Sequence, residues 1–179
     1  MQWLRGHIGQ SEDRVKTELN PNGQNTGAIV EKMARQLVSA AFWDSVYPKG
    51  AMLWCAAAGS TAYLEACQDA GNVEAENTWR RVLSVDCDTL YKRCKAKGWI
   101  RSLETLRDAP IGAILFFGTE ADVSHVELVE RIEGTEEVTV YTVGGNIGNA
   151  VGKARYDAAS GRQIGSGSRR IVAYAVPVL

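Results

Sequence analysis

The spacing of apolar residues changes at Pro110, and this change limits the architectures open to the chain. Before Pro110, apolar residues recur at the spacing of amphipathic helices. After it come short apolar or alternating runs, typical of strands, separated by glycine-rich or acidic turns. Because the helices precede the strands rather than alternate with them, the sequence predicts an α+β domain with N-terminal helices packed on an antiparallel sheet of about five strands.

Three helices are predicted in the first part of the chain. They run from 28 to a break at 47–50, from 54 to 69 or 70, and from 77 or 78 to about 97. Gly71 is the expected C-cap of the second helix, and Asn77 or Thr78 the expected N-cap of the third. Cys87 and Cys94 fall on the apolar stripe of the third helix, so we expect both to lie in the core.

Five strands are predicted after Pro110, over 111–117, 124–132, 138–143, 151–157 and 170–176. Alternation in the second of them places His125 and Glu127 on the face opposite the core side chains. A hairpin centred near Gly134 would pair His125 with a residue close to Val143.

Length and charge narrow the class of protein. A chain of 179 residues suits one domain, which we expect over 27–179, preceded by an arm or short helix over 1–26. With 20 basic and 21 acidic side chains, the chain lacks the positive charge of a nucleic-acid-binding domain. No apolar run approaches a membrane span, and residues 1–6 lack the apolar segment of a signal peptide. We therefore expect synthesis in the cytoplasm, or a leader that precedes this sequence.

Cys55 is the candidate nucleophile. It follows Trp54 and precedes a run of alanines, so a helix starting there places its thiol on the first turn. The free backbone N–H groups and the helix dipole stabilise a thiolate at that position, and the thiolate is the reactive form. The alternative is that Cys55 is a small apolar core residue, as most single cysteines are.

A cysteine nucleophile needs a base, and the chain has two histidines. His7 lies in the polar N-terminal segment, where a solvated side chain is expected. His125 follows a loop at the start of a strand, a position that can hold a functional group rigidly at a cleft. Asn146 is the predicted residue that orients the imidazole, with a turn-forming role as the alternative.

No cofactor or metal is expected. The four cysteines show no C-x-x-C spacing, and with two histidines they do not fit a zinc site. The glycine-rich segment 144–153 resembles a phosphate-binding loop, but Ile147 and Ala154 stand where that motif needs glycine and Ser or Thr.

Four segments, in order, resemble the CHAP family of cysteine, histidine-dependent amidohydrolases/peptidases, relatives of NlpC-type and papain-like enzymes. They are Trp54-Cys55-Ala56, 110–117, Ser124-His125-Val126 and 143–146, and the resemblance covers about residues 50 to 176. It implies a papain-like fold with Cys55 as nucleophile, His125 as base and Asn146 as the orienting residue, and no metal. Trp54, Tyr47 and Glu127 are then candidates for lining the substrate cleft, with core packing as the alternative for Trp54.

The same resemblance implies a substrate. CHAP enzymes cleave amide bonds of bacterial peptidoglycan, in the stem peptide, the cross-bridge, or between muramic acid and L-alanine. Many are phage lysins or cell-division hydrolases, so the expected activity is that of an amidase or endopeptidase acting at the bacterial cell wall. Two rivals remain: a non-catalytic structural or wall-binding domain of the same fold, and a related cysteine acyltransferase or deamidase acting on protein.

Three positions depart from the family pattern. Ala113 replaces the strand aspartate, Glu127 replaces the glycine after His-Val, and Gly144 replaces a frequent glutamate before Gly-Asn. The change at Gly144 removes a carboxylate that can lie near the histidine in the family. The expected triad therefore relies on Asn146 alone.

Overall fold

The fold is α+β. The computed structural model describes residues 1–13, 20, 22–46 and 54–178. Its sheet has six strands in the order β1-β6-β2-β3-β4-β5, and every neighbouring pair is antiparallel. The helices are α1 (Gln2–Gly6), α2 (Ala28–Leu37), α3 (Ala40–Val46), α4 (Trp54–Asp69), α5 (Val73–Arg80) and α6 (Cys87–Ala96). The strands are β1 (Ile100–Arg101), β2 (Ile114–Thr119), β3 (Asp122–Glu133), β4 (Thr139–Ile147), β5 (Ala150–Asp157) and β6 (Ile171–Ala175), with a 3-10 helix over Leu103–Asp108 between β1 and β2.

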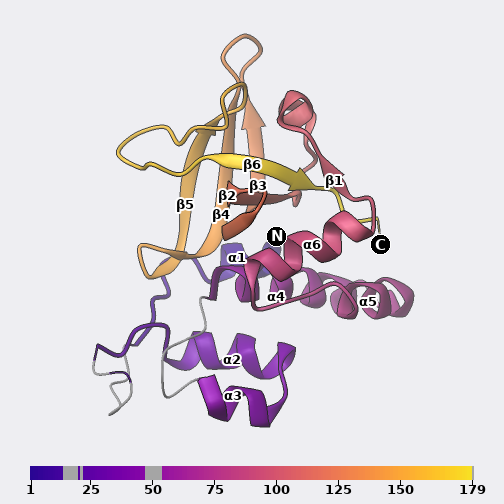
Figure 1. Ribbon diagram of the computed structural model, residues 1–179, viewed down its shortest axis with the longest axis vertical. Coiled ribbons are helices and arrows are strands. Elements are labelled where there is room, and N and C mark those ends of the chain that lie inside the picture. The colour runs from indigo at the N-terminus through magenta and orange to yellow at the C-terminus, as the bar shows by residue number, and fades with distance from the viewer. Residues whose placement is uncertain (14–19, 21, 47–53, 179) are drawn as a thin grey trace.

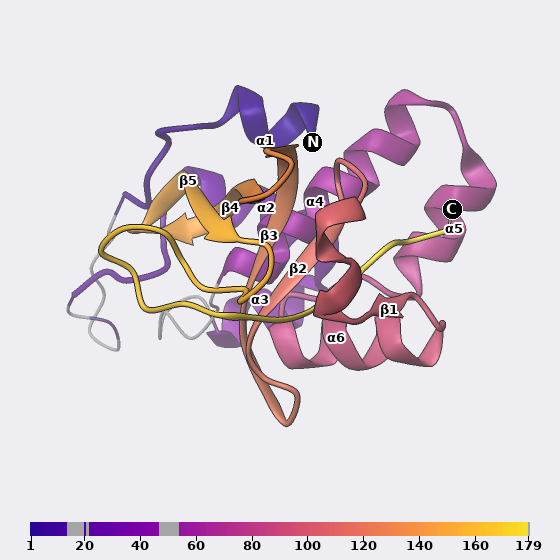
Figure 2. The same cartoon turned by 90° about the horizontal axis from the view of Figure 1, so that it is seen from above.

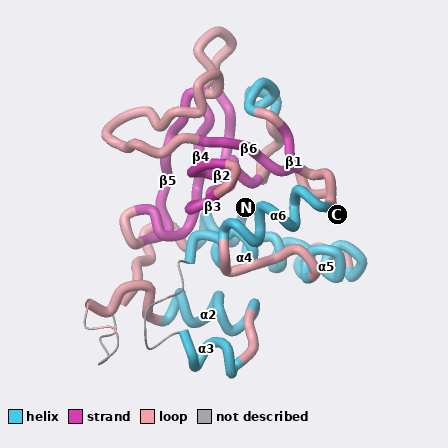
Figure 3. Tube along the Cα trace, in the orientation of Figure 1, coloured by secondary structure: helices cyan, strands magenta, loops and turns pink. Residues whose placement is uncertain are grey.

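Helix α4 is the element on which the other helices and the sheet meet. It contacts β3 and β4 on the sheet, and α1, α2, α5 and α6 among the helices. Figures 1 and 3 show the α-helices gathered on one side of the strands, with α2 and α3 farthest from the sheet and the 3-10 helix apart from them, beside β1. All residues from Trp54 to Ala62 are buried, which explains the small side chains in this helix, because a helix surrounded by protein has no polar face to present.

The strands bury side chains on both faces. Along β2, Ile114 and Phe116 pack in the core with α4, whereas Leu115 and Phe117 pack in a second core on the other face. Tyr156 of β5 belongs to this second core. The predicted apolar strand after Pro110 is therefore buried on both sides, as its continuous apolar run indicates.

The N-terminal segment begins with the short helix α1, and this helix packs into the domain. Leu4 is fully buried in the same core as α4, and α1 contacts α4 and β4 (Figure 2). Backbone hydrogen bonds then join the chain to the start of β5, from Gly9 N–H to Val151 O and from Val151 N–H to Gln10 O. No described helix is both long and apolar enough to cross a membrane.

Two helix predictions were wrong for the same physical reason. The predicted third helix is two helices, because Asn72 and Asp86 each act as N-caps and accept hydrogen bonds from Ala75 N–H and Thr89 N–H. The predicted first helix is also divided, since Val38 is extended and the Ser39 hydroxyl accepts from Phe42 N–H at the start of α3. Local caps interrupt an apolar stripe that spacing alone makes continuous. The second helix matches its prediction, including Gly71 after its end, at a φ of 62°.

Each of the five predicted strands is present, and β1, of two residues, is additional. The register of the β3–β4 hairpin differs from the prediction: Val143 pairs with Leu128, and not with His125. The ladder begins with Glu133 opposite Thr139, so the hairpin is centred near Glu136 and not near Gly134, and the bulge between Val129 and Arg131 changes the pairing by only one residue.

Candidate active site

Cys55 is the second residue of α4, as expected for a nucleophile at a helix N-terminus. Its thiol is almost fully buried, with 2% of the residue exposed. The backbone N–H of Ala56, on the same turn, makes the smallest of the contributions that lower the pKa of the Cys55 thiol. The first turn of α4 therefore acts on the sulfur through a specific N–H group as well as through its dipole.

His125, on β3, is the partner of Cys55. The two side chains interact, and the positive imidazole adds to the lowering of the thiol pKa. The His125 ring also packs against Phe117, with ring centroids 5.6 Å apart. His7 is remote from this arrangement: its ring stacks on Trp3, and Nδ1 lies 2.7 Å from the Trp3 carbonyl oxygen.

The two pKa values move in opposite directions. For Cys55, a hydrogen bond from Cys87 is the largest cause of a pKa well below the usual thiol value; burial opposes it, and His125 adds to the lowering. For His125, burial is the largest single effect and lowers the pKa, but hydrogen bonds and charge from Cys55 and Glu127 together raise it above the usual imidazole value. These shifts favour a thiolate–imidazolium pair, the reactive state of a cysteine hydrolase.

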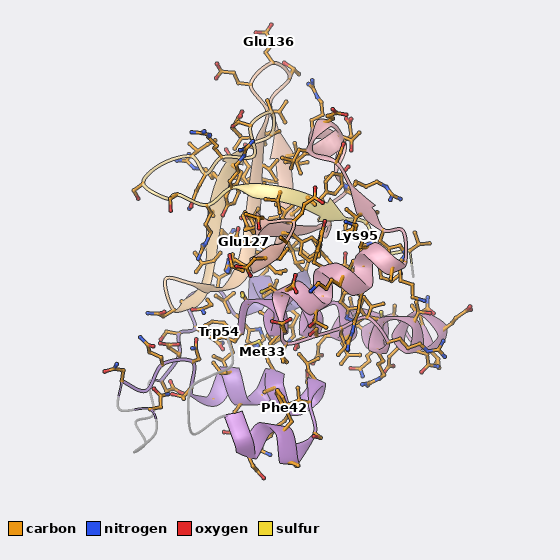
Figure 4. All side chains as sticks on the ribbon, in the orientation of Figure 1. Met33, Phe42, Trp54, Lys95, Glu127 and Glu136 are labelled. Carbon is orange, nitrogen blue, oxygen red and sulfur yellow. The ribbon has the colours of Figure 1, made fainter. Side chains whose placement is uncertain are left out.

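Glu127 supplies the carboxylate that orients the imidazole. Its Oε1 lies 3.1 Å from His125 Nε2. His125 precedes Glu127 by two residues on β3, so the two side chains lie on the same face of the strand. With Nε2 bonded to this carboxylate, Nδ1 is the nitrogen left for the thiol. Figure 4 shows Glu127 inside the fold, far from Glu136 at the tip of the β3–β4 hairpin.

The Glu127 carboxylate is buried but fully paired. Besides His125, Oε1 accepts from the Tyr156 hydroxyl at 2.9 Å and from Arg169 Nη1 at 3.4 Å, while Oε2 accepts from the Thr142 hydroxyl. Burial and the nearby carboxylate charge raise the pKa of Tyr156, so its hydroxyl remains a donor. A carboxylate can be buried only when hydrogen bonds replace its lost hydration. The four partners of Glu127 do this, and they also fix its position against the imidazole.

Gly144 makes room for this carboxylate. A Cβ atom at position 144 would lie 2.9 Å from Glu127 Cγ, so any side chain there would collide with Glu127. The residues at positions 127 and 144 are therefore sterically linked. The glutamate is absent at position 144, and a glutamate from the neighbouring strand fills the adjacent space.

Cys87 also belongs to the site, although its spacing predicted a core role. Its Sγ lies 3.3 Å from Cys55 Sγ. Because α6 begins at Cys87, after the N-cap Asp86, this thiol lies on a first helical turn rather than within a helix. The sequence signal was the capping residue Asp86 followed directly by cysteine.

The structure places the remaining predicted residues as follows. The Asn146 amide donates to Asn25 Oδ1 at 3.4 Å, and Asn146 has a φ of 58°, typical of a turn. Glu127, expected in the cleft wall, is the residue bonded to the imidazole in the place predicted for Asn146. Trp54 is fully buried and packs against Gly145 in the core. Tyr47 lies outside the described residues.

A cavity of about 420 Å³ lies next to the site, over the loop that precedes β6. Arg169 lines it and also reaches Glu127, so this cavity adjoins the hydrogen-bonded side chains. Arg162 and Arg170 line it as well and make it basic. Among the described residues, no group of three or more Cys, His, Asp or Glu side chains is arranged to hold a metal ion.

Comparisons with known proteins add no relative. No protein-family model, no curated protein and no solved structure matches this chain.

Proposed function

We propose that this chain is a papain-like cysteine amidohydrolase of the CHAP type that cleaves amide bonds in bacterial peptidoglycan. One observation carries the proposal: the His125 imidazole interacts with the Cys55 thiol, and its Nε2 lies 3.1 Å from the Glu127 carboxylate. A nucleophile, a base and a group that orients the base form the arrangement that supports acyl transfer by a cysteine. The orienting group in this proposal is Glu127 and not Asn146.

The reaction has two steps. The Cys55 thiolate attacks the amide carbonyl, and the backbone N–H groups at the start of α4 stabilise the negative oxygen of the tetrahedral intermediate. Protonated His125 gives its proton to the leaving amine, which leaves a thioester on Cys55. Neutral His125 then takes a proton from water, which hydrolyses the thioester, releases the carboxylate product and restores the thiolate.

Digestion of purified peptidoglycan tests this activity. We expect new amino and carboxyl termini in the stem peptide or cross-bridge, or a free L-alanine amine, with the sugar chains intact. The measurement is labelling of free amines together with mass spectrometry of the released fragments. New reducing sugar ends, or no release at all, would contradict the proposal.

Burial favours a second candidate, a non-catalytic CHAP-like structural or wall-binding domain. Cys55 is 2% exposed and His125 is 7% exposed, so both reacting groups are covered by protein. In such a domain the pair would serve to hold α4 against β3. Binding to peptidoglycan without cleavage would be the expected result for this candidate.

The pH dependence of alkylation separates the two candidates. Only the thiolate reacts with iodoacetamide, so the rate rises with pH through the thiol pKa. For the hydrolase we expect Cys55 to react in the folded protein with a midpoint well below the ordinary value of about 8.5. Cys67 and Cys94 are matched controls, because burial raises the pKa of each, that of Cys94 to about 12. If Cys55 reacts only after unfolding, the non-catalytic candidate holds.

A further inference from the structure

Two cysteines from distant parts of the chain meet at the candidate site. Cys55 Sγ and Cys87 Sγ are 3.3 Å apart and belong to residues separated by 32 positions. Each lies in the first turn of its helix, Cys55 in α4 and Cys87 in α6. The hydrolytic mechanism needs one sulfur, so the second calls for its own explanation.

The surroundings make the two sulfurs unequal. The Ala56 N–H lowers the pKa of both thiols and so favours negative charge at this point. His125 adds its positive charge on the Cys55 side, whereas the Asp86 carboxylate lies on the Cys87 side and, with burial and the contact to Cys55, raises the pKa of Cys87. The proton therefore stays on Cys87, which donates its S–H to the Cys55 thiolate.

A thiolate in contact with a protonated thiol is the arrangement of an attacking cysteine and its resolving partner. The sulfurs need to approach from 3.3 Å to a bond length of about 2.05 Å. Cys67 and Cys94, the other two cysteines, have no sulfur of another cysteine in such contact, although both are buried. The pair is therefore a specific feature of the site rather than a result of cysteine content.

We propose that Cys55 and Cys87 form a reversible disulfide when the protein meets a peroxide. The Cys55 thiolate attacks one oxygen of hydrogen peroxide, the O–O bond breaks, and the departing hydroxide takes a proton to become water. The product is a sulfenic acid on Cys55. The Cys87 sulfur then attacks the Cys55 sulfur, and the sulfenic oxygen leaves with the Cys87 proton as a second water. In all, two thiols and one peroxide give one disulfide and two waters.

The disulfide has two consequences. It prevents further oxidation of Cys55 to the irreversible sulfinic and sulfonic acids. It also removes the nucleophile until a dithiol reduces the bond, and this second consequence alone depends on the proposed hydrolase function. Cys87 is thus a modification site that links the N-terminal ends of α4 and α6.

Mass spectrometry of the whole chain tests the disulfide without any hydrolytic assay, so its failure is distinct from failure on peptidoglycan. The folded protein is treated with hydrogen peroxide, free thiols are blocked in acid, and peptides are mapped without reductant. We expect a linked pair of peptides containing Cys55 and Cys87, lost on treatment with dithiothreitol. In C87A and C87S we expect no link and accumulation of sulfinic acid on Cys55.

The matched control is C94A, which removes another buried thiol from the same helix and should leave the link unchanged. Circular dichroism of each variant checks that it is folded. Sulfinic acid on Cys55 of the wild-type protein with Cys87 still free would overturn the proposal. So would two free thiols after treatment, or a link from Cys55 to Cys67 or Cys94.

Discussion

Replacing Cys55 with alanine is expected to lower the rate of peptidoglycan hydrolysis by on the order of 10⁴-fold or more. The substitution removes the sulfur that forms the covalent intermediate in the proposed reaction, and neither His125 nor Glu127 can replace it. Because alanine already fills the three positions that follow, the start of α4 should remain helical. The measurement is the initial rate of amine release at saturating enzyme.

Cys67→Ala provides the matched control. Cys67 lies in the same helix and is buried to a similar degree, but it is not one of the three residues of the proposed catalytic site, Cys55, His125 and Glu127. We expect a loss of about 1 kcal/mol in stability and a rate within about twofold of wild type. Equal rates for the Cys55 and Cys67 variants would end the assignment of Cys55 as the nucleophile.

Replacing Glu127 with glutamine is the second substitution with a large expected effect. Glutamine keeps the volume of the side chain but removes the charge that balances the imidazolium, so we expect kcat to fall by about 10²- to 10⁴-fold. The carboxylate also raises the pKa of His125. Without it that pKa falls, and since activity is lost at high pH when His125 loses its proton, the alkaline limb of kcat/KM should move to lower pH.

The pH profile separates this positioning role from a merely structural one. Glu130→Gln is the control, because Glu130 is a buried carboxylate on the same strand that pairs with Lys153 and Arg5 instead of His125. We expect Glu130→Gln to lower stability without moving the alkaline limb. A profile for Glu127→Gln with an unshifted limb would contradict the role given to Glu127.

A double substitution tests whether the carboxylate beside His125 can be supplied from position 144 on β4 instead of position 127 on β3. Gly144→Glu alone should be strongly destabilising, since its Cβ would lie 2.9 Å from Glu127 Cγ. Combined with Glu127→Gly, the closest contact is removed, only backbone contacts of 3.2 Å to Glu127 Cα and Val126 O remain, and β4 supplies the carboxylate. We expect the double variant to be more stable and more active than either single variant, with a coupling energy read from the four proteins.

Much of the fold follows from local pattern. The start and end of α4 and the five main strands were predictable because helix caps, apolar periodicity and turn residues act within a few positions. The position of Cys55 at a helix N-terminus and of His125 and Glu127 on one face of a strand follows from the same short-range rules. The divided helices were predictable in principle, from Ser39, Asn72 and Asp86, but apolar spacing concealed them.

The composition of the site depended on tertiary structure. The β3–β4 ladder begins with Glu133 opposite Thr139, which sets its register, and the imidazole is bonded to Glu127 while Asn146 bonds to Asn25. The contact between Cys55 and Cys87 requires two helices, far apart in the chain, to begin at the same point in space. The sequence by itself determined which residues are chemically able to react, because helix ends and strand faces are local properties. Only the tertiary structure decided which of them touch, because register and helix packing depend on contacts across the whole domain.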